Sequence, residues 1–500
     1  MKRSLLGLAL MASLTGAYAQ PMLVKDINPG TNGSFPCRIT AFGKKLVFAA
    51  DDGTNGTELW SMDSSGTNIA FNINPAAASG FSYNVNRPMP NVGKFIYFPA
   101  NNGTSGTELY RWDGTNPPAL ASEIAAGATG SAIDEVVTLN GKIYFDANDG
   151  TYGEELWVYD TMTNTSARLT DVYTSGSSNI ADITVFNNKL YFSAFNTTTG
   201  SELYSYDPAT NATALVLDIE AGGSSSSPNN LVVINGKLYF TATTFANGRE
   251  LYSYNGTSVT RLTDVVTGAN NGISASGTGT SLIVGLGGAV YFSGNESISS
   301  LGHLYKYDPA TGLTTLVYKI NPTGSSNITN MFVYNGKIIF NANNGTQGAE
   351  LWWYKGTGIP AMVADIRSGA LSSSPAEFCL LNNTLYFQAA DSLNGGELFK
   401  FFDSTSSGIA NIAFNGTVNV YPNPASANVT VDIKLSQAAQ LGMKLVDMAG
   451  RVVYSTAVAE YNSGSNKLNI SVSNLATGSY IYTVFDNNGR TMVSGRLVKE

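Results

Sequence analysis

The sequence has very little of what enzymes use for covalent chemistry. It contains one histidine, His303, and two cysteines, Cys37 and Cys379. A serine–histidine–aspartate triad or a zinc site with several histidines cannot be assembled around a single histidine without unusual partners. Glycine-rich phosphate loops, zinc-protease helix motifs and paired-cysteine redox motifs are also missing from the sequence. We therefore expect no catalytic, cofactor-binding or metal-binding residues.

Charge and long apolar runs are scarce as well. Only 13% of the residues are charged, and no stretch keeps the apolar period of 3.6 residues that marks a helix. Residues 1–19 are predicted to be a signal peptide, because basic residues precede an apolar centre and Ala17-Tyr18-Ala19 provides a cleavage site. No later apolar run is long enough to cross a membrane, so we expect an exported chain without a membrane span.

What the sequence has in quantity is one repeated segment, which occurs eight times. In its third copy, residues 141–160, a strand ending at Phe145 is followed by a turn and by a strand that opens at Glu155. The glutamate follows the phenylalanine by ten positions in seven copies, and in the irregular sixth copy His303 replaces it. Four strands are expected in the third copy, at residues 134–139, 142–147, 155–159 and 167–172.

A repeat that carries only strand signals and has a period in the forties is typical of a β-propeller. We therefore predict an all-β fold, with an eight-bladed propeller in residues 20–402. Residues 21–28 are similar to the fourth strand of other copies, yet they precede every other strand. The simplest explanation is that this N-terminal strand completes the last blade and closes the ring, which removes open sheet edges.

Two residue types recur at fixed places in the hairpin, and we predict that both are structural. A glycine two residues before each glutamate is expected to supply a positive φ angle. The glutamates are expected to accept hydrogen bonds from backbone N–H groups of the hairpin loop. The alternative is a set of calcium sites, which the missing EF-hand spacing disfavours. The glycines are Gly56, Gly106, Gly153, Gly200, Gly248, Gly348 and Gly395, and the glutamates are Glu58, Glu108, Glu155, Glu202, Glu250, Glu350 and Glu397.

The repeats also carry a resemblance. The segment Glu108-Leu109-Tyr110-Arg111-Trp112-Asp113-Gly114-Thr115 is similar to the signature of bacterial ELWxxDGT repeat proteins. Other copies match less fully, since the copy that begins at Glu350 has Lys355 in place of the aspartate. The resemblance covers about residues 40–400, and it implies a secreted, propeller-like domain without catalytic residues.

The two cysteines are predicted to lie in neighbouring blades of the closed ring. Cys37 precedes Phe48 by eleven positions, whereas Cys379 precedes Phe387 by eight. That offset suits the geometry of a disulfide poorly, although an exported protein permits one. A disulfide and two buried free thiols therefore both remain open.

A second domain is predicted at the C-terminus. Residues 403–416 read as a linker, and the short strands that follow in residues 417–500 suggest a small β-sandwich. The expected strands are residues 418–421, 429–435, 442–447, 452–455, 467–472, 478–485 and 491–499.

This tail resembles the C-terminal sorting domain of the type IX (Por) secretion system, because four sequence landmarks of that domain occur in the same order. The resemblance implies export across the outer membrane of a Bacteroidetes-type, Gram-negative bacterium. The implied partner is the secretion machinery, and the implied location is extracellular or on the outer-membrane surface. The landmark residues are Tyr421, Pro422, Asn423, Pro424, Gly450, Arg451, Gly478, Tyr480 and Lys499.

Charge limits the remaining partners. The leader and the tail each carry a net charge of +2 and the whole chain carries −8, so the residues between them carry −12. An acidic domain repels phosphate backbones, so nucleic acid is not expected as a partner. We predict a binding or adhesion module for a glycan or a protein, using the variable loops between repeats. The alternative is an extracellular polysaccharide hydrolase or lyase with carboxylates in the channel.

A functional site should break the symmetry of the repeats. The sixth copy does so through its longer spacing, Glu296, His303 and the glycine-rich residues 268–288. We expect His303 to be a structural variant of the recurring glutamate.

Overall fold

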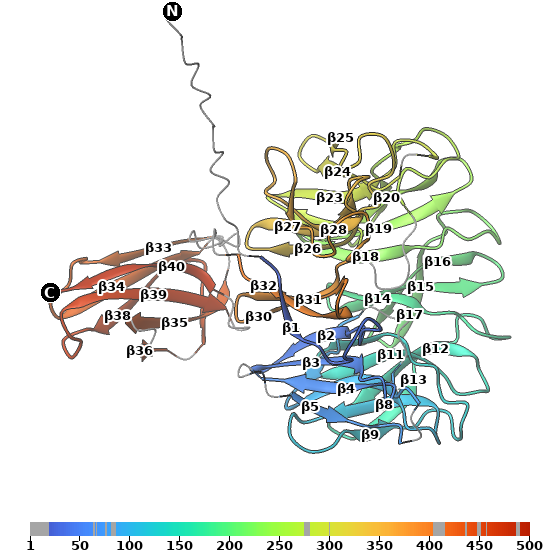
Figure 1. Cartoon of the computed structure of the whole chain (residues 1–500), viewed down its shortest axis with the longest axis horizontal. Coiled ribbons are helices and arrows are strands. Elements are labelled where there is room, and N and C mark those ends of the chain that lie inside the picture. Colours follow the sequence, from blue (N-terminus) through green and yellow to red (C-terminus); the bar gives the residue numbers. More distant parts are fainter. Residues whose placement is uncertain are drawn as a thin grey trace, which may run out of the picture. The chain divides into compact units, whose positions relative to one another are not determined.

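The computed structural model describes residues 20–63, 66, 68–75, 78–81, 87–274, 281–299, 301–403, 416–435, 438–447, 452–456, 458–486 and 491–500. The chain divides into two compact units, Met1–Asp403 and Ser404–Glu500. Every regular element in the described residues is a strand (Figure 1), so these residues include no helix that could cross a membrane. The predicted signal peptide and most of the predicted linker lie outside the described residues.

The first unit contains eight sheets of four antiparallel strands, here called sheet 1 to sheet 8 in chain order. In sheets 1 to 7, four consecutive strands pair in sequence order. The strands of sheets 1 to 4 are β2 (Cys37–Phe42), β3 (Lys45–Asp51), β4 (Thr57–Met62), β5 (Asn68–Phe71); β6 (Asn91–Val92), β7 (Phe95–Asn101), β8 (Thr107–Trp112), β9 (Ala119–Ser122); β10 (Val136–Leu139), β11 (Lys142–Asn148), β12 (Glu154–Asp160), β13 (Thr165–Arg168); β14 (Ala181–Phe186), β15 (Lys189–Asn196), β16 (Gly200–Asp207) and β17 (Ala212–Leu217).

Sheets 5 to 7 follow the same plan, and sheet 8 takes its fourth strand from the start of the chain. The strands are β18 (Asn229–Ile234), β19 (Lys237–Thr244), β20 (Gly248–Tyr254), β21 (Val259–Arg261); β22 (Ile283–Leu286), β23 (Ala289–Gly294), β24 (His303–Asp308), β25 (Leu313–Tyr318); β26 (Thr329–Tyr334), β27 (Lys337–Asn343), β28 (Ala349–Tyr354), β29 (Ala361–Ala364); β30 (Ala376–Leu381), β31 (Thr384–Asp391), β32 (Gly395–Phe401) and β1 (Met22–Lys25).

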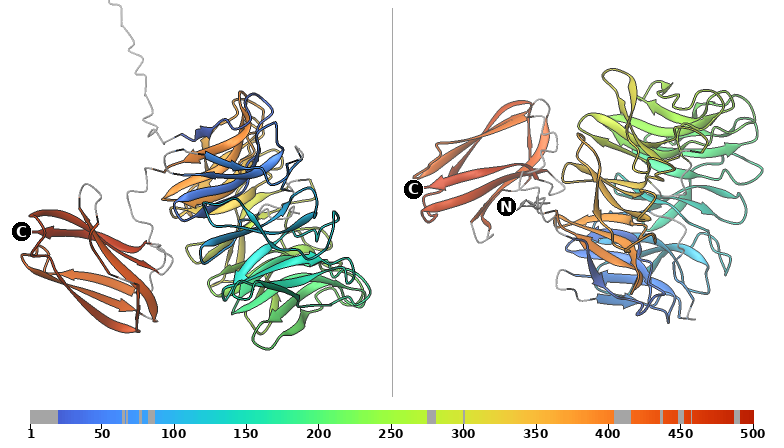
Figure 2. Two further views of the ribbon diagram at one scale, coloured as in Figure 1. Left: turned by 90° about the horizontal axis from the view of Figure 1, so that it is seen from below. Right: turned by 45° about the horizontal axis from the view of Figure 1, so that its top comes forward.

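The ends of the first unit meet in sheet 8. β1 pairs with β32 and puts Leu23 opposite Phe399. The first strands of sheets 3 to 8 contact each other in order, from β10 to β30, and β30 also contacts β2 of sheet 1. Figures 1 and 2 show the same neighbourhood, with the blue strands of sheet 1 beside the orange strands of sheet 8.

The apolar core lies between neighbouring sheets. Phe145 of sheet 3 packs with Tyr97 and Leu109 of sheet 2, whereas Tyr144 and Leu156 of sheet 3 pack against sheet 4. Both faces of a sheet are therefore buried, as the apolar second strand of each repeat indicates. The phenylalanines that recur once per repeat are at most 1% exposed: Phe48, Phe98, Phe145, Phe192, Phe240, Phe292, Phe340 and Phe387.

The two cysteines are free and buried. Cys37 belongs to the apolar cluster between sheets 1 and 2, and Cys379 to the cluster between sheets 8 and 1. The two thiols thus face different cores, which explains why neighbouring strands do not bring them together. Burial raises the pKa of Cys37 to about 12 and that of Cys379 to about 11.

The last described residue of the first unit is firmly held. Asp403 forms an ion pair with Lys337, and their side chains are 1% and 8% exposed. The backbone N–H of Asp403 donates a hydrogen bond to the Tyr334 hydroxyl at 3.1 Å. The ammonium group of Lys337 also lies 3.8 Å from the centre of the Trp353 ring. The chain therefore leaves β32 at a fixed point.

The second unit has two sheets packed on one apolar core. The core includes Val431, Leu445, Val484 and Leu497, all fully buried. One strand, β37, was not predicted, because it has only three residues. The sheets consist of β33 (Gly416–Tyr421), β34 (Asn428–Leu435) and β38 (Gly464–Ser471), and of β35 (Ala439–Asp447), β36 (Val452–Ser455), β37 (Ala459–Tyr461), β39 (Gly478–Asp486) and β40 (Thr491–Lys499).

Candidate ligand-binding site

The recurring glutamates hold the loops that lead from one sheet to the next, here called connecting loops. Glu350 accepts hydrogen bonds from the N–H of Ile366 at 2.8 Å and of Ser373 at 2.9 Å, and from the Ser373 hydroxyl at 2.6 Å. These donors lie between sheets 7 and 8, so the prediction that they belong to the hairpin loop was wrong. The hairpin loop is instead capped by its own Asn344, which accepts a hydrogen bond from the N–H of Thr346.

The same bond pattern joins the other sheets. In sheet 8 the donors to Glu397 include Ile27 and Ser34, so this glutamate ties the last sheet to the segment between β1 and β2. In sheet 6, Nδ1 of His303 lies 2.8 Å from the Ser326 hydroxyl, and burial lowers the pKa of the imidazole. His303 therefore occupies the structural position of the glutamates. Equivalent bonds are made by Glu58, Glu108, Glu155, Glu202 and Glu250.

Burial raises the pKa of all seven glutamates, while the hydrogen bonds from the connecting loops act in the opposite direction. The sequence contains a signal for these bonds between glutamates and connecting loops, which the spacing of glutamate and phenylalanine does not show. A serine recurs in the connecting loops, and most of these serines donate their hydroxyl to the glutamate. The serines are Ser34, Ser131, Ser178, Ser226, Ser326 and Ser373.

The recurring glycines explain why the hairpin and the connecting loop can touch. Gly153 has a φ of +78°, as the sequence predicts, and a Cβ there would lie 2.5 Å from the backbone nitrogen of Ser177. Close backbone approach is therefore a second reason for glycine, beside the conformation. The other six glycines, Gly56, Gly106, Gly200, Gly248, Gly348 and Gly395, also have positive φ.

A separate group of charged side chains lies near the first strands of the sheets. Arg87 contacts Glu135 at 3.1 Å and also forms an ion pair with Asp182. Glu135 accepts hydrogen bonds from the backbone N–H groups of Asp182 and Ile183, at 3.0 and 2.8 Å. These carboxylates thus join sheet 3 to sheet 4 and offset the charge of Arg87.

Other carboxyl groups in this region have strongly raised pKa values. Burial raises the pKa of Glu154 and of Glu377 to about 7 in each case. Asp146 is buried and accepts a hydrogen bond from the N–H of Glu135 at 2.7 Å. Glu377 borders a cavity of about 200 Å³, and its Oε1 has no hydrogen-bond partner among the described residues. The sequence could not predict this convergence, because these residues come from different repeats.

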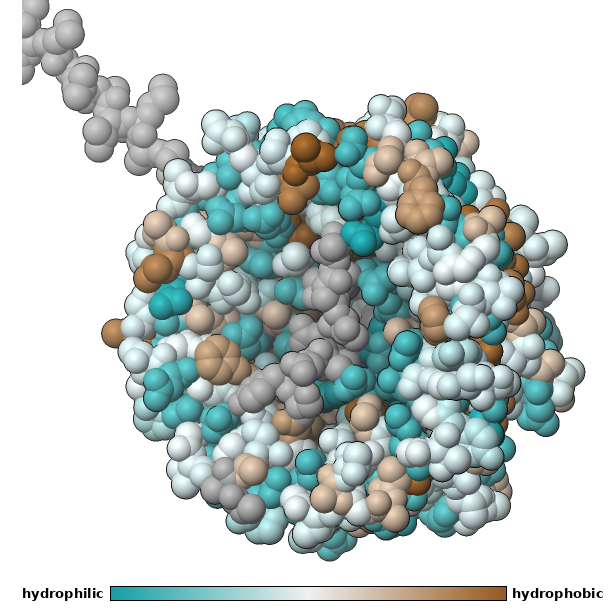
Figure 3. All heavy atoms as spheres, turned by 90° about the vertical axis from the view of Figure 1, so that its right-hand side faces the viewer, coloured by the Kyte–Doolittle hydropathy of each residue, from teal (hydrophilic) through white to brown (hydrophobic). Residues whose placement is uncertain are grey.

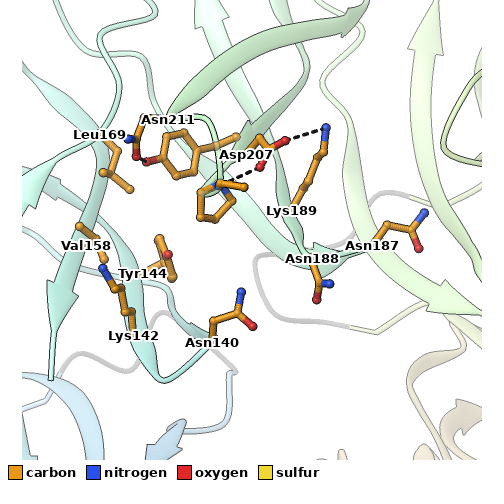
Figure 4. A pocket seen from close by; sticks show the side chains of 13 residues that line it. Asn140, Lys142, Tyr144, Val158, Leu169, Asn187, Asn188, Lys189, Asp207 and Asn211 are labelled. Atoms are coloured by element: carbon orange, nitrogen blue, oxygen red, sulfur yellow. Dashed lines mark hydrogen bonds and ion pairs between the residues drawn. The ribbon is translucent and has the colours of Figure 1, made fainter. Parts of the chain in front are cut away.

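Larger hollows also occur in the described part of the chain. One, of about 560 Å³, lies between sheets 3 and 4 (Figure 4). Its lysines are already paired, Lys189 with Asp207 at 3.1 Å and Lys142 with Asp160 at 3.0 Å. Asn140 and Asn188, which occupy turn positions with positive φ, also line it. This hollow is therefore lined by strand and turn residues of sheets 3 and 4, and both of its lysines have carboxylate partners.

Another hollow, here called the Arg249 pocket, has a volume of about 480 Å³. It combines β20 with the connecting loops on both sides of sheet 6 and with the sheet 6 hairpin, so it lies at the repeat that the sequence singles out. It is lined by Arg249, Ala269, Asn270, Asn271, Ile273, Ser274, Asn295, Ile298, Leu301, Asn327, Ile328 and Thr329. Residues 275–280, part of the glycine-rich residues 268–288, lie outside the described residues.

Hydrogen bonds fix the walls of the Arg249 pocket. The backbone N–H of Arg249 donates to Oδ1 of Asn271 at 2.8 Å, and the Asn295 amide donates to the Asn271 carbonyl at 2.9 Å. Asn295 Oδ1 also accepts a hydrogen bond from Ser274 at 2.7 Å. Glu296, which the sequence also singled out, is not among the lining residues and pairs with Lys319 at 2.5 Å. The pocket is therefore held by neutral polar side chains.

Among the described residues, no group of three or more histidine, cysteine, aspartate or glutamate side chains is arranged to hold a metal ion. The side chains at the start of the hairpin loops cap their own turns. Asp52, for example, accepts hydrogen bonds from the N–H groups of Thr54 and Asn55, both at 2.8 Å. Calcium binding at these loops stays an alternative to this structural role.

In the second unit, several landmark residues of the tail hold the C-terminal strand. Asn423 donates to the carbonyl of Arg496 at 2.8 Å and accepts a hydrogen bond from the N–H of Val498 at 2.9 Å. Tyr480 donates its hydroxyl to the Ala476 carbonyl at 2.7 Å. Gly450 and Arg451 lie outside the described residues. Asn423 therefore holds β40, and Tyr480 holds the turn that precedes β39.

Residues 419–500 match the secretion system C-terminal sorting domain. This sorting domain marks the chain for secretion to the cell surface or the extracellular space. No curated protein matches the chain.

Several solved structures are weakly similar to this chain. A puromycin-hydrolysing peptidase of Mycobacterium tuberculosis is 13% identical with a TM-score of 0.46, over 84% of this chain and 61% of that one. PorZ, a surface component of the type IX secretion system of Porphyromonas gingivalis, is 12% identical with a TM-score of 0.30, over 93% of this chain and 82% of that one. The chain spans only about three fifths of the puromycin hydrolases, 59% in another case. At such scores neither likeness indicates an activity for this chain.

Proposed function

We propose that the eight sheets are the blades of a closed eight-bladed β-propeller, with β1 as the closing strand. The pairing of β1 with β32 and the contact of β30 with β2 support this proposal. Membership of the repeats in the ELWxxDGT group is part of the same proposal and rests on the repeat signature alone. In such a ring, connecting loops and hairpin loops gather at one end, since each recurring glutamate ties one to the other.

The proposed function is that of a secreted, non-catalytic binding module that attaches to a glycan at this loop end. The observation that carries the proposal is the Arg249 pocket, where β20 meets the loops around the irregular sixth repeat. Loops on a rigid scaffold are where recognition usually occurs, and about 480 Å³ is ample for one or two sugar rings.

The surface chemistry favours a glycan over a protein ligand. Figure 3 shows a mainly hydrophilic face on which hydrophobic side chains form small, separate patches. Stable protein partners usually need a larger continuous apolar area. Asn270, Asn271 and Asn327 are exposed in the pocket, and their amides can both donate to and accept from sugar hydroxyl groups.

One observation favours a second candidate, an extracellular polysaccharide hydrolase or lyase. Glu154 has a pKa near 7, which suits a general acid, and the nearby carboxyl groups of Asp134 and Glu135 contribute to the shift. However, Glu135 and Asp182 are engaged with Arg87 and with backbone N–H groups. A pair of carboxylates that is used for structure is not available to act on a glycosidic bond.

The mature chain should be screened on a glycan array and assayed for hydrolysis of the same glycans, with and without calcium. We expect binding without turnover and no dependence on calcium. The double variant Asn270→Ala, Ile298→Ala should weaken binding at least about tenfold, whereas the control Lys189→Gln, in the hollow between sheets 3 and 4, should not. Turnover that is lost in Glu154→Gln would overturn the proposal in favour of the hydrolase, and so would a complete lack of glycan binding.

A further inference from the structure

The Arg249 pocket contains a cation that no nearby carboxylate offsets. Burial lowers the pKa of Arg249, and no acidic group contributes in the opposite direction. None of the described residues that line the pocket is an aspartate or a glutamate. In a first unit that is strongly acidic overall, Arg249 thus lacks the carboxylate partner that Arg87, Arg168 and Arg261 have.

Other arginines of the first unit show the difference. Arg261, in the next strand of the same sheet, pairs with Asp264 at 3.3 Å. Arg168 pairs with Asp171 at 3.0 Å, and Arg87 has two carboxylate partners. Arg249 forms no ion pair with a described residue, although it is half-buried. A partly buried charge without a counter-charge costs free energy, and a bound anion would reduce that cost.

The position of Arg249 in its repeat supports a role specific to this site. It directly precedes the recurring glutamate, where other repeats carry small or neutral residues such as Thr57, Ser201 and Ala349. Only Glu154 is also charged at this position. The arginine is therefore not required by the repeat.

The rest of the pocket suits a sugar that bears the anion. Asn270, Asn327 and Thr329 offer neutral donors and acceptors around the arginine. Ile298, which is 77% exposed, offers an apolar surface for the C–H face of a ring. The hydrogen bond from the backbone N–H of Arg249 to Asn271 holds the connecting loop against β20, so the backbone of the pocket needs little ordering on binding.

We propose that the Arg249 pocket binds the carboxylate of a uronic acid unit in an acidic polysaccharide, a step that rests on the glycan-binding function proposed above. Arginine matches a carboxylate through two parallel N–H···O bonds, which a neutral sugar cannot replace. The acidic surroundings repel a polyanion at long range, so binding depends on the local pair. We expect Arg249 to contribute a factor of about 10 to 100 in affinity.

The test compares an oligogalacturonate with the same oligosaccharide after reduction of its carboxyl groups, both titrated into the mature chain in the presence of a chelator. The wild type should bind the acidic form at least about tenfold more tightly. Arg249→Gln should bind both forms equally and weakly, whereas Arg261→Gln should retain the preference. Circular dichroism and the melting temperature of each variant separate loss of binding from loss of folding.

The outcomes separate the two proposals. Equal binding of the acidic and the reduced forms by the wild type would overturn the uronate inference and leave the glycan-binding module standing. A preference for the acid that persists in Arg249→Gln would also overturn the inference. Failure to bind any glycan would overturn both, and Arg249-dependent binding of poly-glutamate in place of glycans would assign the pocket to acidic peptides instead.

Discussion

Gly153 and Gly150 lie in one hairpin loop and have nearly the same φ, +78° and +79°, but different surroundings. A Cβ at Gly153 would meet the backbone of Ser177, whereas a Cβ at Gly150 would meet nothing within 4 Å. Gly153→Val should therefore cost about 1–3 kcal/mol more of the free energy of unfolding than Gly150→Val. Urea denaturation measures both variants. Equal losses would show that the close approach of the two loops does not matter.

Glu154 makes stability depend on pH. Burial raises its pKa from the ordinary value of 4.5 to about 7, with the charges of Asp134, Glu135 and Glu155 adding to the shift. When a carboxyl group has a higher pKa in the folded than in the unfolded state, the protein loses stability as the pH rises from the unfolded-state pKa to the folded-state pKa. Glu154→Gln should therefore stabilise the protein by about 1–3 kcal/mol at pH 8 and by clearly less at pH 5.

Calorimetry at the two pH values measures this difference. Glu123→Gln is the matched control, since Glu123 is exposed and its replacement should change stability little at either pH. An equal gain for Glu154→Gln at pH 5 and pH 8 would contradict a raised pKa.

At the residue scale the sequence predicts backbone conformation better than it predicts hydrogen-bond partners. The glycine at position 153 indicates a positive φ, because a turn position that is glycine in every regular repeat is one where a Cβ would be strained. The donors to Glu350 could not be deduced in the same way, since they lie 16 and 23 residues further along the chain. Spacing alone does not show which of two adjacent loops folds back onto a carboxylate.

At the scale of elements, β1 completes sheet 8. It covers the edge of β32, and the N–H of Ile27, just beyond β1, donates to Glu397. A mature chain that lacks residues 20–28 should melt at least about 5 °C lower and form dimers, because an uncovered strand edge pairs with other chains.

Differential scanning calorimetry and light scattering test this deletion. A control in which Met22 and Lys25, the residues at the ends of β1, are exchanged for threonine keeps the backbone pairing and should remain monomeric. Unchanged melting of a monomeric deletion variant would contradict the closing role of β1.

The strands themselves were largely predictable, because the second and third strands of each repeat are rich in apolar and aromatic residues. The ends of two strands in sheet 3 could not be predicted. β10 begins at Val136, two residues later than expected, because the N–H groups of Asp134 and Glu135 turn to the carboxylate of Asp146. β13 ends at Arg168, since Thr170 and the residues after it are held by Glu155. Side chains from other strands decided both boundaries.

At the scale of the whole molecule, the second unit carries the signal for secretion. A chain that ends at residue 416 lacks the sorting domain and should accumulate in the periplasm of the native host, whereas the full chain reaches the surface or the medium. Fractionation followed by protease treatment of intact cells measures the difference. Normal surface display of the truncated chain would contradict the role assigned to the tail.

The order of the repeats and the tail could be predicted from the sequence, but the Arg249 pocket could not. The pocket joins Arg249 and Ile298 to Asn327, residues far apart in the chain that only the packing of three successive sheets brings together. Sequence reasoning pointed to the repeat at which this pocket lies, because the sixth copy breaks the spacing, but it singled out Glu296 and His303. Both of those side chains have local partners, Lys319 and Ser326.

The fixed exit of the chain at Asp403 has a mechanical consequence. A molecule held by its C-terminal end and pulled at its loops would carry the load along β32, the strand that leads to that exit. β32 is paired on both sides, with β31 and with β1, and the ion pair of Asp403 with Lys337 clamps its end. A force along a strand strains many hydrogen bonds at once, whereas a force across it opens them singly. Because β1 pairs with β32, hydrogen bonds on both sides of β32 would resist the load. Without β1, β32 would be an edge strand held on one side only.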